Sequence, residues 1–185
     1  MNKDLLINLN KIFVKYQDSF KGKNFNSENN DFDILMDIFN ITPEMKTGNK
    51  QYWGRELGMC WQLIITEIAK KNCKDFKPAL RIGGDEPTDL FIGNDAIDTK
   101  YRIGSGDSGT LKKFKKYGKF LKDEGYRPVL LILRDDNLKA AITACTTGGW
   151  DIFIGEDCFS YIKNKTGCDL KSFLIEISNK YNIDK

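Results

Sequence analysis

Histidine is absent from this chain of 185 residues. Its absence excludes histidine-based general acid–base chemistry, histidine-containing zinc sites and Ser-His-Asp triads. Any hydrolytic chemistry here must therefore use carboxylates, lysine, a metal ion or a combination of these groups.

The cysteine count and the absence of long apolar runs exclude further classes of protein. The five cysteines are an odd number and form no CxxC motif, so we expect buried free thiols instead of disulfides or a metal site. No apolar run approaches the roughly 20 residues of a membrane span. The start, MNKDLLINLNKIF, has acidic and amide residues where a signal peptide needs an apolar region. We therefore expect a cytoplasmic protein without a membrane partner.

The positive charge is concentrated in one stretch, although the net charge is only +3. Between Lys100 and Lys122 there are eight Lys or Arg residues and one acidic residue, Asp107. A basic stripe of this kind indicates a polyanionic partner more strongly than the global charge does.

The stretch from Asp89 to Lys100, DLFIGNDAIDTK, contains two strand-like runs around Gly93-Asn94. A two-residue Gly-Asn loop predicts a β-hairpin. In that register Asp89 lies opposite Asp98, and both acids share a face with Lys100. Opposed like charges destabilise a sheet, so the two acids indicate a divalent cation such as Mg²⁺.

Two other interpretations of the hairpin stay open. Its polar residues are also typical of an ordinary solvated hairpin face. A loop at Asn94-Asp95 would no longer place Asp89 and Asp98 directly opposite each other.

The remaining pattern predicts helices and strands in an order that defines a fold class. Helices are expected at 4–18, 32–39, from Thr42-Pro43, and at about 51–71, 110–124, 138–145, 156–165 and 169–181; strands are expected at 77–82, in the hairpin, at 128–133 and in DIFI. This order predicts an α/β or α+β fold with a central mixed sheet flanked by helices. We expect one domain over 1–185, with N-terminal helices in 1–48, a catalytic core at about 50–135 and an extension over 136–185.

The helix expected at about 51–71 offers a third carboxylate to the acid pair. Glu56 is preferred because it lies near the helix start beside Gly54, and Glu67 on nearly the same face is the alternative. Each is also explained as an exposed helical charge.

The helix expected at 110–124 has a narrow apolar stripe and is otherwise crowded with lysines. No glutamates are interleaved to form i,i+4 pairs, which argues against an ordinary solvated charged face. Lysines in this arrangement contact phosphates without reading sequence. The expected nucleic-acid contacts are Arg102, Ser105, Lys112, Lys113, Lys115, Lys116 and Lys119.

The run from Gly104 to Gly109, GSGDSG, also matches the GxGxxG pattern of dinucleotide-binding folds. The preceding strand, DAIDTKYRI, alternates charged residues, whereas the first strand of such a fold is buried on both faces. We therefore expect the glycines to form a tight turn that lets Ser105 and nearby amides approach a phosphate.

Pro87-Thr88-Asp89 and Asp98-Thr99-Lys100, after a helical glutamate and within this element order, resemble the PD-(D/E)xK nuclease core of restriction endonucleases. The first motif is spread as P-x-D, and the second acid is Asp where Glu is commoner. The run DTKYRIGSGDSGTLKKF and the short length resemble more specifically the small subunit of heterodimeric type IIS restriction endonucleases.

The resemblance implies an activity, a cofactor and a partner. A Mg²⁺-dependent endonuclease of this kind cuts one strand of double-stranded DNA beside a larger recognition and nicking subunit, and leaves 5′-phosphate and 3′-hydroxyl ends. Asp89, Asp98 and, through the helix, Glu56 would be metal ligands, and Lys100 would orient the attacking water. A self-sufficient homodimeric restriction enzyme, a nickase and a non-catalytic basic DNA-binding module are the alternatives.

Overall fold

The computed structural model of the protein describes residues 33–104 and 106–183. The helix expected at 4–18 and the residue Ser105 lie outside this part of the chain. The elements in chain order are α2 (Ile34–Phe39), α3 (Pro43–Gly48), α4 (Lys50–Asn72), β1 (Phe76–Ile82), β2 (Asp85–Ile92), β3 (Asp95–Lys100), α5 (Ser108–Asp123), β4 (Arg127–Ile132), α6 (Lys139–Gly148), β5 (Asp151–Ile154), α7 (Glu156–Thr166) and α8 (Leu170–Glu176).

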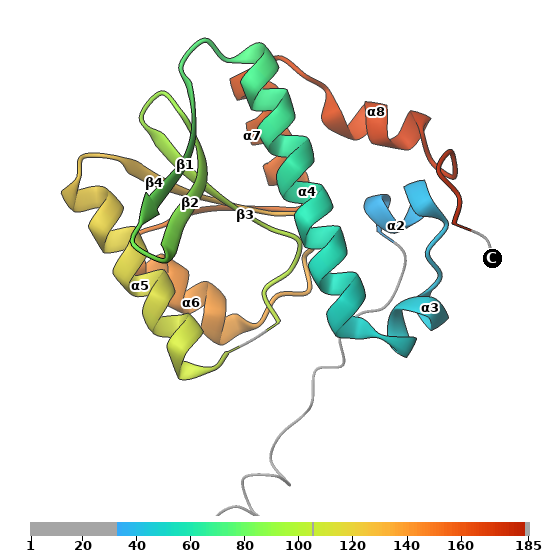
Figure 1. Cartoon of the computed structure of the whole chain (residues 1–185), viewed down its shortest axis with the longest axis horizontal. Helices are drawn as coiled ribbons and strands as arrows, with labels where there is room; N and C mark the ends of the chain where they lie inside the picture. Colours follow the sequence, from blue (N-terminus) through green and yellow to red (C-terminus); the bar gives the residue numbers. More distant parts are fainter. Residues whose placement is uncertain (1–32, 105, 184–185) are drawn as a thin grey trace, which may run out of the picture.

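The five strands form one mixed sheet in the order β1-β2-β3-β4-β5. The first three strands are antiparallel, whereas β3, β4 and β5 run parallel and are connected through α5 and α6. Helices α5 and α6 cover one face, and α4 and α7 cover the other, with α2 and α8 packed outside them (Figure 1). The expected α/β fold with a helix-flanked mixed sheet is confirmed.

The β2–β3 hairpin turns at Gly93-Asn94, as the sequence predicts, and Gly93 has the positive φ of +59° that this turn requires. The paired residues are Leu90 with Ile97, Phe91 with Ala96 and Ile92 with Asp95. The alternative loop at Asn94-Asp95 is thereby excluded. The apolar face of the hairpin joins the core beneath α4 through Leu90, Ile92 and Ile97.

The strand pairing ends one step before the expected Asp89–Asp98 pair. The Thr88 hydroxyl lies 2.7 Å from the Ile97 carbonyl oxygen and 2.9 Å from the Leu90 carbonyl oxygen. This buried side chain therefore takes an acceptor that regular pairing would offer to the main chain. The two strands separate at this point, and Asp89 lies at the separation.

Strand β3 is buried along nearly its whole length, including Asp95, Asp98 and Thr99, which are 4%, 8% and 5% exposed. The sequence suggested an alternating, half-exposed strand, and that expectation is wrong. Helices cover both faces of β3, and the strand lies between β2 and β4 in the middle of the sheet.

Because β3 is buried, its charged residues no longer argue against a dinucleotide site. The packing around the glycine run that follows β3 gives a different argument against such a site. The space beside Gly104 is filled by the Arg102 guanidinium, and that beside Gly106 by the Leu138 side chain. A dinucleotide site needs open space beside such glycines for the pyrophosphate, whereas side chains of the chain's own fold occupy that space here.

Helices α5 and α6 approach each other closely at two glycines. A Cβ on Gly118 would lie 2.4 Å from the Gly148 carbonyl oxygen, and a Cβ on Gly148 would lie 2.7 Å from that of Phe114. The Trp150 indole N–H donates to the Phe114 carbonyl at 2.8 Å and closes the contact. This packing holds α5 against the sheet.

The C-terminal helix is shorter than the expected range of 169–181, because α8 ends at Glu176. Asn179 adopts a left-handed conformation with φ of +57°. The chain after it runs along α2, where the amides of Asn179 and Tyr181 donate to the carbonyls of Asp37 and Ile38. Tertiary hydrogen bonds to α2 thus replace the continuation of the helix.

The five cysteines are free, as expected, although only Cys145 and Cys158 are fully buried. Across residues 33–104 and 106–183, none of the helices combines the length and the hydrophobicity needed to cross a bilayer.

The start of β3 is held by a buried ion pair. The Asp95 carboxylate lies 2.6 Å from Lys165 Nζ and 3.6 Å from the Arg127 guanidinium, and it accepts a 2.6 Å hydrogen bond from the Tyr161 hydroxyl. Burial raises the pKa of Asp95, but the hydrogen bonds from Lys165 and Tyr161 and the nearby positive charges more than offset it. The pKa of Asp95 in the folded protein is therefore lowered.

We predict that Asp95→Asn destabilises the fold by about 1–3 kcal/mol at pH 7, because charged hydrogen bonds are lost in a buried site. A lowered pKa contributes stability above the unfolded-state pKa of about 4, and this contribution is lost as the pH falls through the folded-state value. Urea denaturation at pH 7 and pH 3 should show a larger difference between the two proteins at pH 7. A difference independent of pH would contradict the ionic contribution.

Candidate active site

The structure brings two of the sequence-predicted residues together as an ion pair on β3. Lys100 Nζ lies 2.7 Å from Asp98 Oδ1 and also donates to the Thr99 carbonyl at 3.1 Å. The Asp98 side chain is 12% exposed and the Lys100 side chain 35% exposed. The lysine therefore reaches solvent while its acid partner is nearly buried.

Asp89 lies beside this pair, at the separation of β2 and β3. Its Oδ2 accepts hydrogen bonds from the backbone N–H and the hydroxyl of Thr99, both at 2.7 Å. Its Oδ1 accepts a 2.8 Å hydrogen bond from the side-chain amide of Gln62 on α4. The carboxylate is thus fixed by the neighbouring strand and by the helix that covers the sheet.

The three charged groups influence one another strongly. Burial, opposed by the charge of Lys100 and reinforced by that of Asp89, raises the pKa of Asp98 to about 6. Burial lowers the pKa of Lys100, but the charges of Asp98 and Asp89 more than offset this, so that it is raised overall. At neutral pH Asp98 is therefore largely ionised and faces the ammonium of Lys100.

Such a donor set fits a small, hard cation. Within the described residues, no group of three or more His, Cys, Asp or Glu could together hold a metal ion. Mg²⁺, however, usually takes only one or two protein carboxylates and fills its other positions with water and phosphate oxygens. Asp89 and Asp98 match that requirement, and a cation beside them would offset both the lost hydration of the buried Asp98 and its repulsion by Asp89.

Neither of the two α4 glutamates has a contact with Asp89. Glu56 pairs with the neighbouring Arg55 at 3.0 Å, with its side chain 47% exposed, and Glu67 lies 3.8 Å from Lys71. The α4 residue that contacts Asp89 is Gln62.

Sequence reasoning missed Gln62, Thr88 and Thr99. Thr88 and Thr99 belong to the two motifs but are uncharged, and their roles depend on where the strands separate. Gln62 directly follows Trp61, which is fully buried. A polar residue beside the most buried position of an amphipathic helix was the one available signal.

A buried thiol interacts with the charges of Asp98 and Lys100. Cys145 on α6 is fully buried, and burial raises its pKa to about 12, with a further contribution from the charge of Asp98. A thiol with so high a pKa is neutral and unreactive at neutral pH, so Cys145 contributes packing and no chemistry.

The predicted nucleic-acid contacts differ in their surroundings. The five lysines at 112, 113, 115, 116 and 119 are all exposed on α5, although Lys113 also lies 3.2 Å from Asp85. Arg102 is less accessible, because its guanidinium pairs with Asp136 at 2.9 Å and its side chain is only 20% exposed. Ser105 lies outside the described part of the chain.

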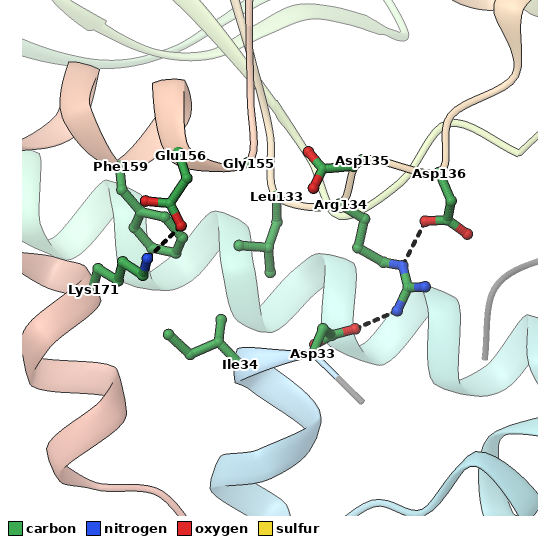
Figure 2. A pocket seen from close by; sticks show the side chains of 10 residues that line it. All are labelled: Asp33, Ile34, Leu133, Arg134, Asp135, Asp136, Gly155, Glu156, Phe159 and Lys171. Atoms are coloured by element: carbon green, nitrogen blue, oxygen red, sulfur yellow. Dashed lines mark hydrogen bonds and ion pairs between the residues drawn. The ribbon is translucent and has the colours of Figure 1, made fainter. Parts of the chain in front are cut away.

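A separate cavity of about 480 Å³ opens where β4 and β5 end and α7 begins. Figure 2 shows Arg134 on its wall, held between Asp33 at 2.6 Å and Asp136 at 2.8 Å, while Glu156 pairs with Lys171. The residues that line it do not include Asp89, Asp98 or Lys100. The acid pair and the lysine therefore lie outside this cavity.

We predict that the Asp98 carboxyl in the metal-free protein titrates near pH 6. Asp89→Asn should lower that pKa, because a neighbouring negative charge is removed, and Lys100→Met should raise it, because the compensating positive charge is lost. Carboxyl ¹³C NMR over pH 3–9 measures both shifts. Equal pKa values in the three proteins would show that the groups are not coupled.

One comparison with known proteins gave a match: a family model described as ApaLI-like restriction endonuclease matches residues 84–179. Neither the curated proteins nor the solved structures gave a significant match. The matched region contains Asp89, Asp98, Lys100 and the whole of α5, and it covers just over half of the chain. The chain therefore belongs to the ApaLI-like restriction endonuclease family.

Proposed function

We propose that this restriction endonuclease cleaves DNA through Asp89, Asp98 and Lys100, as a PD-(D/E)xK nuclease dependent on Mg²⁺. The observation that carries the proposal is the ion pair between the nearly buried Asp98 and the partly exposed Lys100, with Asp89 held beside it. A buried acid of raised pKa next to a second acid is a costly arrangement for stability alone and is typical of functional sites.

The chain's own residues divide the work. Asp89 and Asp98 would hold Mg²⁺, which, when bound, lowers the pKa of an attacking water and stabilises charge on the phosphate. Lys100, which is partly exposed beside Asp98, would orient that water and neutralise negative charge on the phosphate. Positioning for in-line attack supplies much of the rate enhancement, and the products carry 5′-phosphate and 3′-hydroxyl ends.

Helix α5 supplies the surface for the DNA backbone. It is the element that follows β3, the strand that carries Asp98 and Lys100 (Figure 1). Exposed lysines on such a helix contact phosphates and carry little sequence information. The basic surface therefore supports binding of double-stranded DNA near the site.

We further propose that the chain is the small, strand-cleaving subunit of a heterodimeric type IIS enzyme in the cytoplasm. The support is the run from Asp98 to Lys113 and a basic surface suited to phosphates more than to bases. Sequence recognition and cleavage of the other strand would then belong to a larger subunit.

We predict that Asp98→Asn and Lys100→Met each reduce cleavage by at least about 10³-fold, because each removes a group that acts on the reacting phosphate. Duplex affinity measured in Ca²⁺ should change little. The assay is nicking of supercoiled plasmid with Mg²⁺. The control is Lys163→Ala on α7, which removes an exposed lysine that pairs with Asp169. Full activity in either site variant would reject the site assignment.

The same assay, run with and without the protein encoded beside this one, tests the subunit proposal. Double-strand cleavage only in the mixture, reduced to a nick by Lys100→Met, is the expected result. Rapid site-specific cleavage by the purified chain alone would favour a homodimer, and binding without nicking in either condition would favour a DNA-binding module.

We predict that Lys115→Ala with Lys119→Ala weakens binding to all duplex sequences alike. Each phosphate contact contributes about 0.9 to the slope of log K against log salt, so the double variant should lower that slope by roughly 2. Fluorescence anisotropy at 50–200 mM salt measures it. An unchanged slope would place the DNA backbone away from α5.

A further inference from the structure

The middle of α4 contributes a side chain to the acid cluster, and that side chain is neutral. Gln62 Nε2 donates to Asp89 Oδ1 at 2.8 Å, while Thr99 donates twice to Asp89 Oδ2 at 2.7 Å. The three donors approach both oxygens of one carboxylate. The rotamer of Asp89 is therefore set by contacts from two different elements.

The position of Gln62 is fixed by the core around it. Trp61 directly before it is fully buried, and Ile65 one turn later is 3% exposed. Both belong to the core between α4 and the sheet, which includes residues of β2 and β3. Because these anchors hold the helix against β2 and β3, the amide has little freedom to follow Asp89 if the carboxylate moves.

We propose that Gln62 is a positioning residue that holds Asp89 in the orientation needed to bind the divalent cation. This inference rests on the proposed function. An amide adds no charge to the two acids and the lysine, so α4 orients a ligand here without supplying one. Groups that orient metal ligands typically change metal affinity or activity by 10–100-fold when they are removed.

Gln62→Met tests the proposal, because methionine keeps the length and packing of the side chain and removes the donor. We expect the Mg²⁺ concentration for half-maximal plasmid nicking to rise by roughly 10-fold or more, with the rate largely restored at saturating Mg²⁺. A merely structural role would lower the amount of active enzyme at every Mg²⁺ concentration. Gln51→Met, at an exposed glutamine in the first turn of α4, is the matched control.

A direct binding measurement provides a readout besides activity. Mn²⁺ binding to the protein with a bound duplex, followed by the EPR signal of free Mn²⁺, should weaken in Gln62→Met by a similar factor and stay unchanged in Gln51→Met. Gln62→Glu should not restore wild-type affinity if donation by the amide is the function. Wild-type Mn²⁺ affinity together with wild-type Mg²⁺ dependence in Gln62→Met would overturn the proposal.

Asp89→Asn separates failure of this inference from failure of the proposed function. If Asp89→Asn abolishes nicking while Gln62→Met resembles the wild type, Asp89 is functional and Gln62 does not position it. If Asp89→Asn itself retains full nicking and Mn²⁺ affinity, the cation site is wrongly assigned, and the inference about Gln62 fails with it.

Discussion

The burial of Asp98 in the central strand is the constraint on which the rest of the site depends. A carboxylate between two helical layers loses hydration, and its pKa of about 6 records that loss. Lys100 on the same strand supplies the compensating charge, since a buried ion without a partner costs several kcal/mol. A cation beside Asp98 and Asp89 would compensate further. The chemistry of the site is therefore a consequence of where β3 lies in the sheet.

The separation of β2 and β3 turns that constraint into a defined geometry. Beyond Leu90 and Ile97 the side chains of Thr88 and Asp89 take hydrogen bonds that regular pairing would assign to the main chain. Asp89 consequently forms part of the sheet's own hydrogen-bond network. Its orientation is as well determined as that of a backbone group, which suits a residue whose carboxylate must be placed accurately.

Local signals in the sequence were sufficient for the hairpin but insufficient for its surroundings. Gly93-Asn94 predicted the turn and three correct residue pairs, because loop length and turn type determine register. The burial of β3 was missed, because it follows from parallel pairing with β4, which lies beyond the whole of α5. Gln62 was missed for the same reason, since 27 residues separate it from Asp89. The pairing ends before Asp89 and Asp98 because the Thr88 hydroxyl takes the Ile97 carbonyl, which residue spacing alone does not show.

The two helical layers contribute different groups to the proposed site. The connection after Lys100 leads from β3 to α5. Helix α4 contacts Asp89 through Gln62, whereas α5 covers the other face of the sheet (Figure 1) and carries the exposed lysines. Arg102 within the connection is paired with Asp136 after β4, and its guanidinium packs beside Gly104. That contact ties the chain after β3 to the loop that follows β4. Side chains of Arg102 and Leu138 fill the space beside Gly104 and Gly106, so these two glycines allow close packing in the connection between β3 and α5.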